Sequence, residues 1–215
     1  YALNEVPLPP LWQAEDWSRH PGMDYFRRYF DFARPFDEAV LRQLAATYYA
    51  VCTYLDERIG QVLEILRQTG LEEDTRIIYT SDHGECLGSR GLFGKFTLHD
   101  EAAAIPFIMA GPEVPVGKVV ETPVSLVDCF PSVLEAVGAT AVGGDLPGGS
   151  LWQIASAADG ERTVFSEYHA VGSRNASYML RRRRYKYLYH VNESAQLFDL
   201  VADPLEQNDL INAPE

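Results

Sequence analysis

Residues 38–69 form a long segment in which apolar side chains recur at steps of three and four, and this segment limits the fold more than any other. An α-helix has about 3.6 residues per turn, so this spacing gathers the apolar side chains on one face. Gly70 follows, and glycine readily adopts the left-handed conformation that ends a helix. The pattern predicts a long amphipathic helix. Its apolar positions are Tyr48, Val51, Cys52, Leu55, Ile59, Val62, Leu63 and Leu66.

Two short apolar runs follow the predicted helix, at residues 76–80 and 105–110. Both are bounded by polar residues, glycine or proline, which is typical of short buried strands. A second helix is predicted over residues 126–137, with Gly138 at its end. The order helix, strand, loop, strand, helix indicates a layered α/β domain.

The segments on either side of this domain have a different character. Residues 1–37 are rich in proline and aromatic side chains without a sustained period, which indicates an N-terminal arm. We assign residues 38–150 to the α/β domain, with a boundary near the glycine pairs 143–144 and 148–149. Residues 151–215 are predicted to form a small antiparallel sheet subdomain. Its strands are expected at residues 163–168, 178–181, 185–190 and 196–200.

The charge balance excludes some partners. The chain has 18 basic and 31 acidic residues, a formal charge of −13, which repels phosphate backbones and anionic membrane surfaces. We therefore expect no nucleic-acid and no membrane partner. No stretch approaches the roughly 18 apolar residues of a membrane span. We expect a soluble protein of undetermined compartment, with the cytoplasm favoured over the periplasm or secretion.

A polar cluster follows the first predicted strand, at residues 81–85. Ligands collect at the carboxyl ends of strands in open α/β sheets, and Asp82 and His83 can both turn toward one cation there. Gly84 would permit a close approach of the backbone. The alternative is a simple turn in which Asp82 accepts hydrogen bonds from the backbone amides that follow. Lys95 lies farther along the same predicted loop.

A longer run carries a family resemblance, namely SDHGExLGxxGLxxK at residues 81–95 together with IPFI at residues 105–108. These segments resemble the sulfatase family of the alkaline phosphatase superfamily. The similarity is greatest to the branch of choline sulfatases, iduronate sulfatases and phosphonate monoester hydrolases. It extends over residues 38–212, and it implies the C-terminal part of an alkaline phosphatase-like mixed-sheet α/β domain with a small antiparallel β subdomain.

The resemblance implies roles for three residues: Asp82 and His83 would be metal ligands, and Lys95 a catalytic residue that contacts the sulfate or phosphate oxygens. His99 follows Lys95 closely and is a candidate substrate contact in the same cleft. His169 ends a predicted strand of the C-terminal sheet, where related sulfatases bring a loop over the substrate, and is a second candidate contact, with a surface histidine as the alternative. A divalent cation and an ammonium together offset the charge that grows on a transferred group. Many members of the family have asparagine in place of His83. Calcium is favoured, with manganese or zinc as alternatives because an imidazole suits them better.

The family's nucleophile is missing from this sequence. It lies in a Cys-x-Pro/Ala-x-Arg motif of the N-terminal half, whose cysteine or serine is oxidised to formylglycine. Residues 86–90 have the cysteine and the arginine of this motif, but Gly88 stands where proline or alanine is needed. We therefore expect formylglycine only in a preceding N-terminal half, and this chain alone is predicted to be inactive. Cys52 and Cys129 are expected in the core.

Three functions remain open on these grounds. The first is a metal-dependent sulfuric ester hydrolase of the formylglycine type that acts on a small anionic ester. The second is a phosphonate or phosphate ester hydrolase with the same apparatus. The third is a non-catalytic α/β module that binds an anion or a protein partner. A homo-oligomer is also left open, because a chain that exposes a surface made for another segment tends to self-associate.

Overall fold

The computed structural model divides the chain into two compact units. It describes residues 1–140, 146–157 and 160–213. The first unit comprises Tyr1–Pro112 and Ala170–Asn175, and the second comprises Glu113–His169 and Ala176–Glu215. This division does not follow the boundaries predicted at residues 37 and 150, which stay predictions. The glycine pair 143–144 lies outside the described residues.

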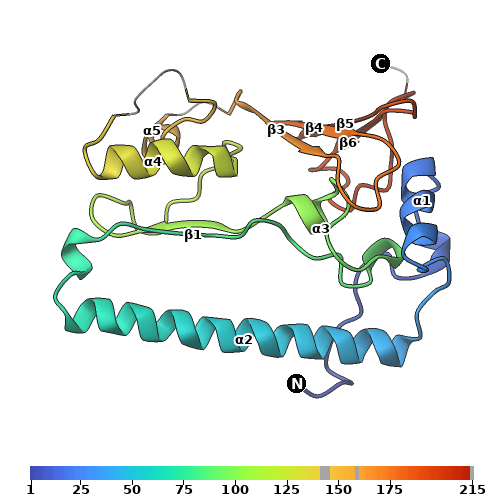
Figure 1. Cartoon of the computed structure of the whole chain (residues 1–215), viewed down its shortest axis with the longest axis horizontal. Helices are drawn as coiled ribbons and strands as arrows, with labels where there is room; N and C mark the ends of the chain where they lie inside the picture. The colour runs from blue at the N-terminus through green and yellow to red at the C-terminus, as the bar shows by residue number, and fades with distance from the viewer. Residues whose placement is uncertain (141–145, 158–159, 214–215) are drawn as a thin grey trace. The chain divides into compact units, whose positions relative to one another are not determined.

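The first unit contains the long helix α2, Glu38–Gln68 (Figure 1). The prediction of a helix over residues 38–69 is confirmed. The helix ends where Gly70 takes a φ of 71° and its amide donates to the Arg67 carbonyl at 3.1 Å. Near its start, Ala45 and Ala46 pack against Val6 from the N-terminal arm. Only its first part is therefore anchored, since its buried residues are Leu41, Ala45 and Ala46.

The N-terminal arm contains a short helix that the sequence pattern did not predict. Helix α1 spans Pro21–Tyr29 and is preceded by a 3-10 turn, η1, at Ala14–Asp16. Proline suits the first helical position because its missing N–H is not needed there. The His20 Nδ1 accepts a hydrogen bond from the Gly22 amide at 3.2 Å and caps the helix.

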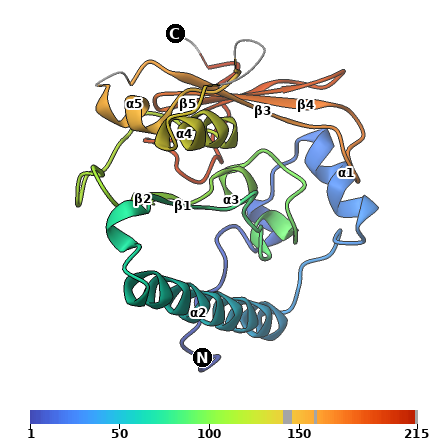
Figure 2. The ribbon, with the colours of Figure 1, turned by 60° about the vertical axis from the view of Figure 1, so that its left-hand side comes forward.

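Strands β1, Ile77–Thr80, and β2, Phe107–Ala110, form an antiparallel pair with Thr80 opposite Phe107. A 3-10 turn, η2, at Glu72–Asp74 leads into β1. Both predicted strands are confirmed, with shorter bounds. Between them lie a 3-10 turn, η3, and a short helix, α3, and Figures 1 and 2 show α3 beyond the carboxyl end of β1. These last two elements span Ser89–Gly91 and Asp100–Ala103.

The second unit combines short helices with a four-stranded antiparallel sheet in the order β3-β4-β5-β6. The predicted helix over residues 126–137 is present as a 3-10 turn, η4, that continues into α4, and α4 packs against α5. The predicted α/β class and the antiparallel sheet are confirmed. The elements are η4 (Leu126–Asp128), α4 (Cys129–Ala136), α5 (Leu151–Ser156), β3 (Thr163–Tyr168), β4 (Ser177–Arg182), β5 (Tyr185–His190) and β6 (Gln196–Asp199).

Two ion pairs with buried groups hold the second unit together. The Asp128 side chain is fully buried and receives both terminal nitrogens of Arg162, at 2.5 and 2.9 Å. On β5, Lys186 lies 2.8 Å from Glu206, and both side chains are at most 1% exposed. A charge buried in this way needs its partner, so each pair is a structural contact whose loss is costly.

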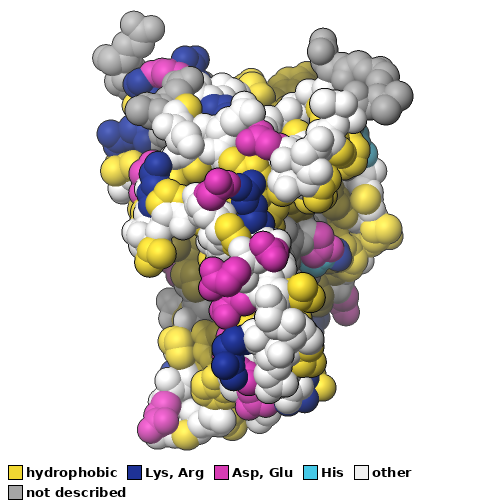
Figure 3. Space-filling view, turned by 90° about the vertical axis from the view of Figure 1, so that its left-hand side faces the viewer, with side chains coloured by type: hydrophobic (Ala, Val, Ile, Leu, Met, Phe, Trp, Pro, Cys, Tyr) yellow, Lys and Arg dark blue, Asp and Glu magenta, His cyan; other side chains and the backbone are white. Residues whose placement is uncertain are grey.

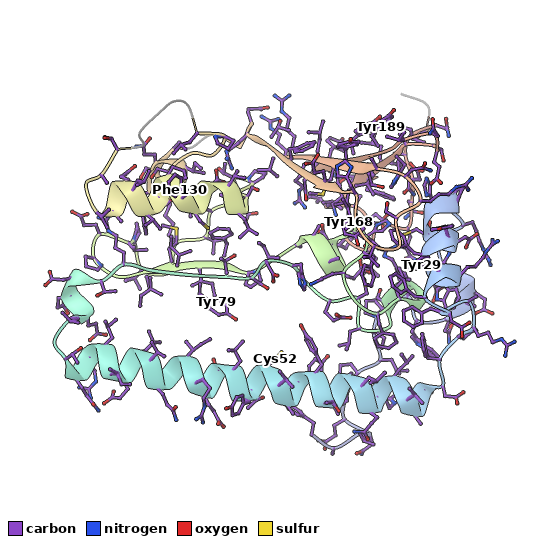
Figure 4. The ribbon with its side chains drawn as sticks, in the orientation of Figure 1. Tyr29, Cys52, Tyr79, Phe130, Tyr168 and Tyr189 are labelled. Atoms are coloured by element: carbon purple, nitrogen blue, oxygen red, sulfur yellow. The ribbon has the colours of Figure 1, made fainter. Side chains whose placement is uncertain are left out.

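The surface mixes all types of side chain. On the face in Figure 3, both signs of charge lie between hydrophobic side chains. None of the helices within the described residues combines the length and the apolar character that crossing a bilayer requires. Cys52 lies on α2 (Figure 4) and is exposed, and Cys129 is half-buried. The expectation that both lie in the core is therefore wrong for Cys52, which none of the described residues buries, and Cys129 is only partly buried.

Candidate active site

The candidate site begins where β1 ends, at Ser81, Asp82 and His83. The Ser81 hydroxyl donates to the His83 carbonyl at 2.8 Å, which closes a tight turn. Asp82 Oδ1 accepts a hydrogen bond from the His83 amide at 3.1 Å. The turn that was the alternative interpretation of this motif is thus present. The turn uses only Oδ1 of this carboxylate. The second oxygen, Oδ2, faces the His83 ring and lies 3.3 Å from Nε2.

The orientation of the His83 ring follows from its other nitrogen. His83 Nδ1 lies 2.8 Å from the Gly84 carbonyl oxygen. A carbonyl can only accept, so Nδ1 carries the hydrogen and Nε2 of the neutral ring keeps its lone pair. Lys95 Nζ is in contact with that Nε2. Asp82, His83 and Lys95, three of the residues singled out from the sequence, therefore come together, and Asp82 and Lys95 are solvent-exposed.

Gly84 allows this turn to lie directly against α3. A Cβ atom at this position would lie 2.2 Å from the Glu101 carbonyl oxygen, well inside van der Waals contact. The Gly84 amide also donates to the Ala102 carbonyl at 2.8 Å. The close approach expected of Gly84 is therefore confirmed, and the neighbouring backbone belongs to α3.

The loop that follows closes on itself and returns Lys95 to His83. Glu85 Oε1 accepts from the Leu87 amide at 3.0 Å and from the Gly94 amide at 2.6 Å. The Cys86 amide donates to the Gly94 carbonyl at 2.9 Å. Glu85 uses its carboxylate to join the two ends of the loop. Its role in this chain is structural.

Residues of the N-terminal arm hold the backbone of the loop that carries Lys95. Arg27, 3% exposed, donates to the Arg90 carbonyl at 3.1 Å, and the Arg90 amide donates to the Leu11 carbonyl at 3.0 Å. Trp17 packs on Gly91, whose φ is 68° and where a Cβ would lie 2.4 Å from the indole ring. The sequence pattern did not reveal this role of the arm. In the sequence this role was indicated only by an arginine within an aromatic-rich segment.

His99 and His169 lie in different units, and their proposed roles stay predictions. His99 immediately precedes α3 and is 2% exposed, and its carbonyl accepts from the Ala103 amide at 2.9 Å. His169, at the end of β3, is 45% exposed. Its Nε2 lies 3.1 Å from Glu167, and its ring meets Tyr178 edge-on with centroids 5.1 Å apart.

Cys86 is unsuited to act as a nucleophile. It is 3% exposed, and burial, reinforced by Glu101 and Glu85, raises its pKa to about 12. The thiolate is the reactive form, so this cysteine is inert near neutral pH. Within the described residues, no group of three or more His, Cys, Asp or Glu side chains could hold a metal ion. The metal-ligand roles expected of Asp82 and His83 therefore stay predictions.

Comparison with known structures places the fold in the alkaline phosphatase-like α/β class. The phosphonate monoester hydrolase SpPMH from Silicibacter pomeroyi superposes with a TM-score of 0.84 at 29% identity, over 100% of this chain and 48% of that chain. Two family models also match, Sulfatase over residues 17–139 and N-sulphoglucosamine sulphohydrolase, C-terminal, over residues 88–215. The chain belongs to the sulfatase family.

Curated relatives agree with this assignment. Arylsulfatase K from Xenopus laevis is 32% identical over 96% of this chain and 41% of the relative. Choline-sulfatase from Rhizobium meliloti (strain 1021) is 34% identical over 98% of this chain and 40% of the relative. The chain thus spans less than half the length of the relatives that it matches. The resemblance to the sulfatase family, recognised from the sequence, is confirmed.

Proposed function

We propose that this chain carries part of the active site of a sulfuric ester hydrolase. In this proposal Asp82 and His83 ligate a divalent cation, and Lys95 contacts the oxygens of a small anionic ester. The observation that carries the proposal is the meeting of these three side chains at the end of β1. The names of the relatives, arylsulfatase K and choline-sulfatase, support sulfate esters as the substrate class.

The chemistry of the two ligands suits a cation. Asp82 Oδ2 and His83 Nε2 lie 3.3 Å apart, and each presents a lone pair. Two such groups repel unless a positive charge lies against them, and in this structure the Lys95 ammonium meets His83 Nε2. Two ligands are too few for a tight site, so the remaining ligands must come from outside the described residues. A bound cation would polarise the oxygens of the transferred group.

Lys95 would contact the oxygens of the transferred group in addition to the cation. Its ammonium and a cation cannot share the single lone pair of His83 Nε2. With a cation bound, the exposed Lys95 side chain must turn away from the imidazole toward the anionic oxygens. A positive charge at that point favours the transition state over the ester, because negative charge grows there as the bond breaks.

Other parts of the proposed machinery lie outside this chain. The nucleophile is proposed to be a formylglycine supplied by another segment of a longer protein, because Cys86 is buried and inert. Calcium is the proposed cation, with manganese or zinc as alternatives. The imidazole of His83 favours the last two, whereas the carboxylate of Asp82 suits all three.

A second candidate is hydrolysis of phosphonate or phosphate esters. The TM-score of 0.84 with a phosphonate monoester hydrolase favours it specifically. The residues described here do not separate the two substrates, because a cation and an ammonium serve a sulfuryl and a phosphoryl group alike. A non-catalytic binding module has no comparable observation in its support.

The test uses the full-length protein and two aryl esters of the same phenol, one a sulfate and one a phosphonate. Lys95→Ala should lower kcat/KM on the order of 10²- to 10³-fold, as loss of one transition-state donor does. Lys118→Ala is the matched control, since Lys118 is also exposed but donates to the Ala155 carbonyl in the second unit. Absence of hydrolysis of both esters by the full-length protein, or equal activities of the two variants, would reject the proposal.

A further inference from the structure

A carboxylate behind the site connects α3 to the loop that carries Lys95. Glu101 Oε1 accepts from the Ser89 hydroxyl at 2.7 Å and from Arg90 Nε at 3.0 Å, and its second oxygen lies 3.2 Å from the same nitrogen. The Arg90 side chain is 2% exposed and that of Glu101 16%. Since the pair is largely removed from water, each charge depends on the other.

The Arg90 backbone needs this support. Its φ of 57° lies in the left-handed region, which is unfavourable for a residue with a Cβ. Such a conformation persists only where the surroundings over-determine it. At Arg90 they do so through the side-chain pair with Glu101 and through both backbone groups, which are bonded to Arg27 and Leu11.

The same short helix also fixes the other end of the loop. The Gly84 amide donates to the Ala102 carbonyl at 2.8 Å, immediately after His83. Adjacent residues of α3 therefore hold the loop twice, with the backbone of Ala102 at its start and with the side chain of Glu101 at its middle. Both attachments lie on the stretch of chain that joins His83 to Lys95.

We propose that Glu101 is a positioning residue that sets the placement of Lys95 relative to His83. The inference rests on the proposed function, because it assigns Glu101 a purpose in that site. Glu101 itself touches neither the proposed cation nor the ester, and acts through Ser89 and Arg90. A further observation agrees with an ionised Glu101. Burial alone would raise its pKa, but Arg90, the Ser89 hydroxyl and backbone hydrogen bonding outweigh burial and hold the pKa below its usual value.

The test combines Glu101→Gln with amide hydrogen exchange in the full-length protein. The backbone amides of Cys86, Gly88 and Gly94 report on the loop. In the wild type they donate hydrogen bonds within the loop at 2.9, 2.7 and 2.6 Å, respectively. The substitution leaves Arg90 buried without its counter-charge. The three amides should exchange faster, and kcat/KM for the ester should fall on the order of 100-fold, as a displacement of about 1 Å does.

The matched control breaks another buried ion pair. Glu206→Gln removes the partner of Lys186 in the second unit, where both side chains are at most 1% exposed. It should lower the melting temperature comparably, yet leave the loop amides and kcat/KM within about twofold of the wild type. Ser89→Ala is a milder second variant in case Glu101→Gln fails to fold. It should change both readouts in the same direction as Glu101→Gln, but less.

The outcomes separate the two proposals. Unchanged exchange of the loop amides in Ser89→Ala and Glu101→Gln overturns the role of Glu101, whatever the activity. Faster exchange with a kcat/KM equal to that of Glu206→Gln also overturns it. If the wild-type protein hydrolyses no ester, the proposed function fails, and the exchange rates still decide whether Glu101 holds the loop.

Discussion

Replacing Gly84 by alanine should push the turn after β1 away from α3 and so disturb the site. The new Cβ would lie 2.2 Å from the Glu101 carbonyl oxygen, whereas ordinary contact begins at 3.4 Å. The two backbones must therefore separate by about 1.2 Å, the difference between these distances. Neither can yield by a side-chain rotation, because the clash involves the main chain of α3.

Two consequences follow from that displacement. Forcing an additional carbon into a packed contact costs about 1–3 kcal/mol of the free energy of unfolding. His83 precedes Gly84 directly, so it moves relative to Lys95. A misplacement of about 1 Å lowers kcat/KM on the order of 100-fold. We expect both effects in the full-length protein.

The measurement pairs urea unfolding, followed by circular dichroism, with initial rates on an aryl ester. Gly60→Ala is the control, because Gly60 lies inside α2 and a Cβ there meets nothing within 4 Å. That variant should gain roughly 0.5–1 kcal/mol, since alanine is the better helix former. If Gly84→Ala unfolds at the wild-type urea concentration and keeps its kcat/KM, the close approach to α3 has no importance for the site.

Three further outcomes can be checked with simpler experiments. In this chain, iodoacetamide at pH 8 should label the exposed Cys52 and spare Cys86, whose pKa of about 12 leaves about one thiolate in 10,000; equal labelling would contradict the burial of Cys86. His83→Asn should weaken zinc binding to the full-length protein relative to calcium by calorimetry, because an amide oxygen replaces the imidazole nitrogen, and an unchanged ratio would argue against His83 as a ligand. The Glu101 pKa is lower in the folded chain, so its stabilising effect is present above the unfolded pKa and is lost as pH falls through the folded one. The difference in urea midpoint between wild type and Glu101→Gln should therefore shrink as the pH falls below the ordinary glutamate pKa of 4.5, and a constant difference would contradict this.

The elements with a sustained pattern were predictable from the sequence. The spacing of apolar residues in α2 and the short apolar runs of β1 and β2 are local properties, set by residues close together in the chain. The meeting of Asp82, His83 and Lys95 agrees with what the motif of residues 81–95 implied. Their chemical roles stay predictions, as do those of His99 and His169.

The features that were missed depend on contacts between distant residues or on short elements. Helix α1, with 9 residues, is too short to show a period, and Pro21 was its main local indication. The pair of Arg90 and Glu101 leaves no pattern, because it depends on a loop folding back onto α3. The exposure of Cys52 was missed because an apolar face indicates a helix but not what covers it.

In this chain the N-terminal end of helix α2 is packed, and its C-terminal end is exposed. Beyond Ala46 none of its residues is buried, and several apolar side chains are in water, including Leu55, Val62, Leu63 and Ile65. A helical stretch without tertiary packing is only marginally stable. Fraying should therefore start near Gln68 and stop where Leu41 packs, so that trypsin cuts after Arg58 and Arg67 before the first unit unfolds. A segment of a longer protein, or the second copy that stays a prediction, would give this end of the helix the protection that the chain alone cannot provide.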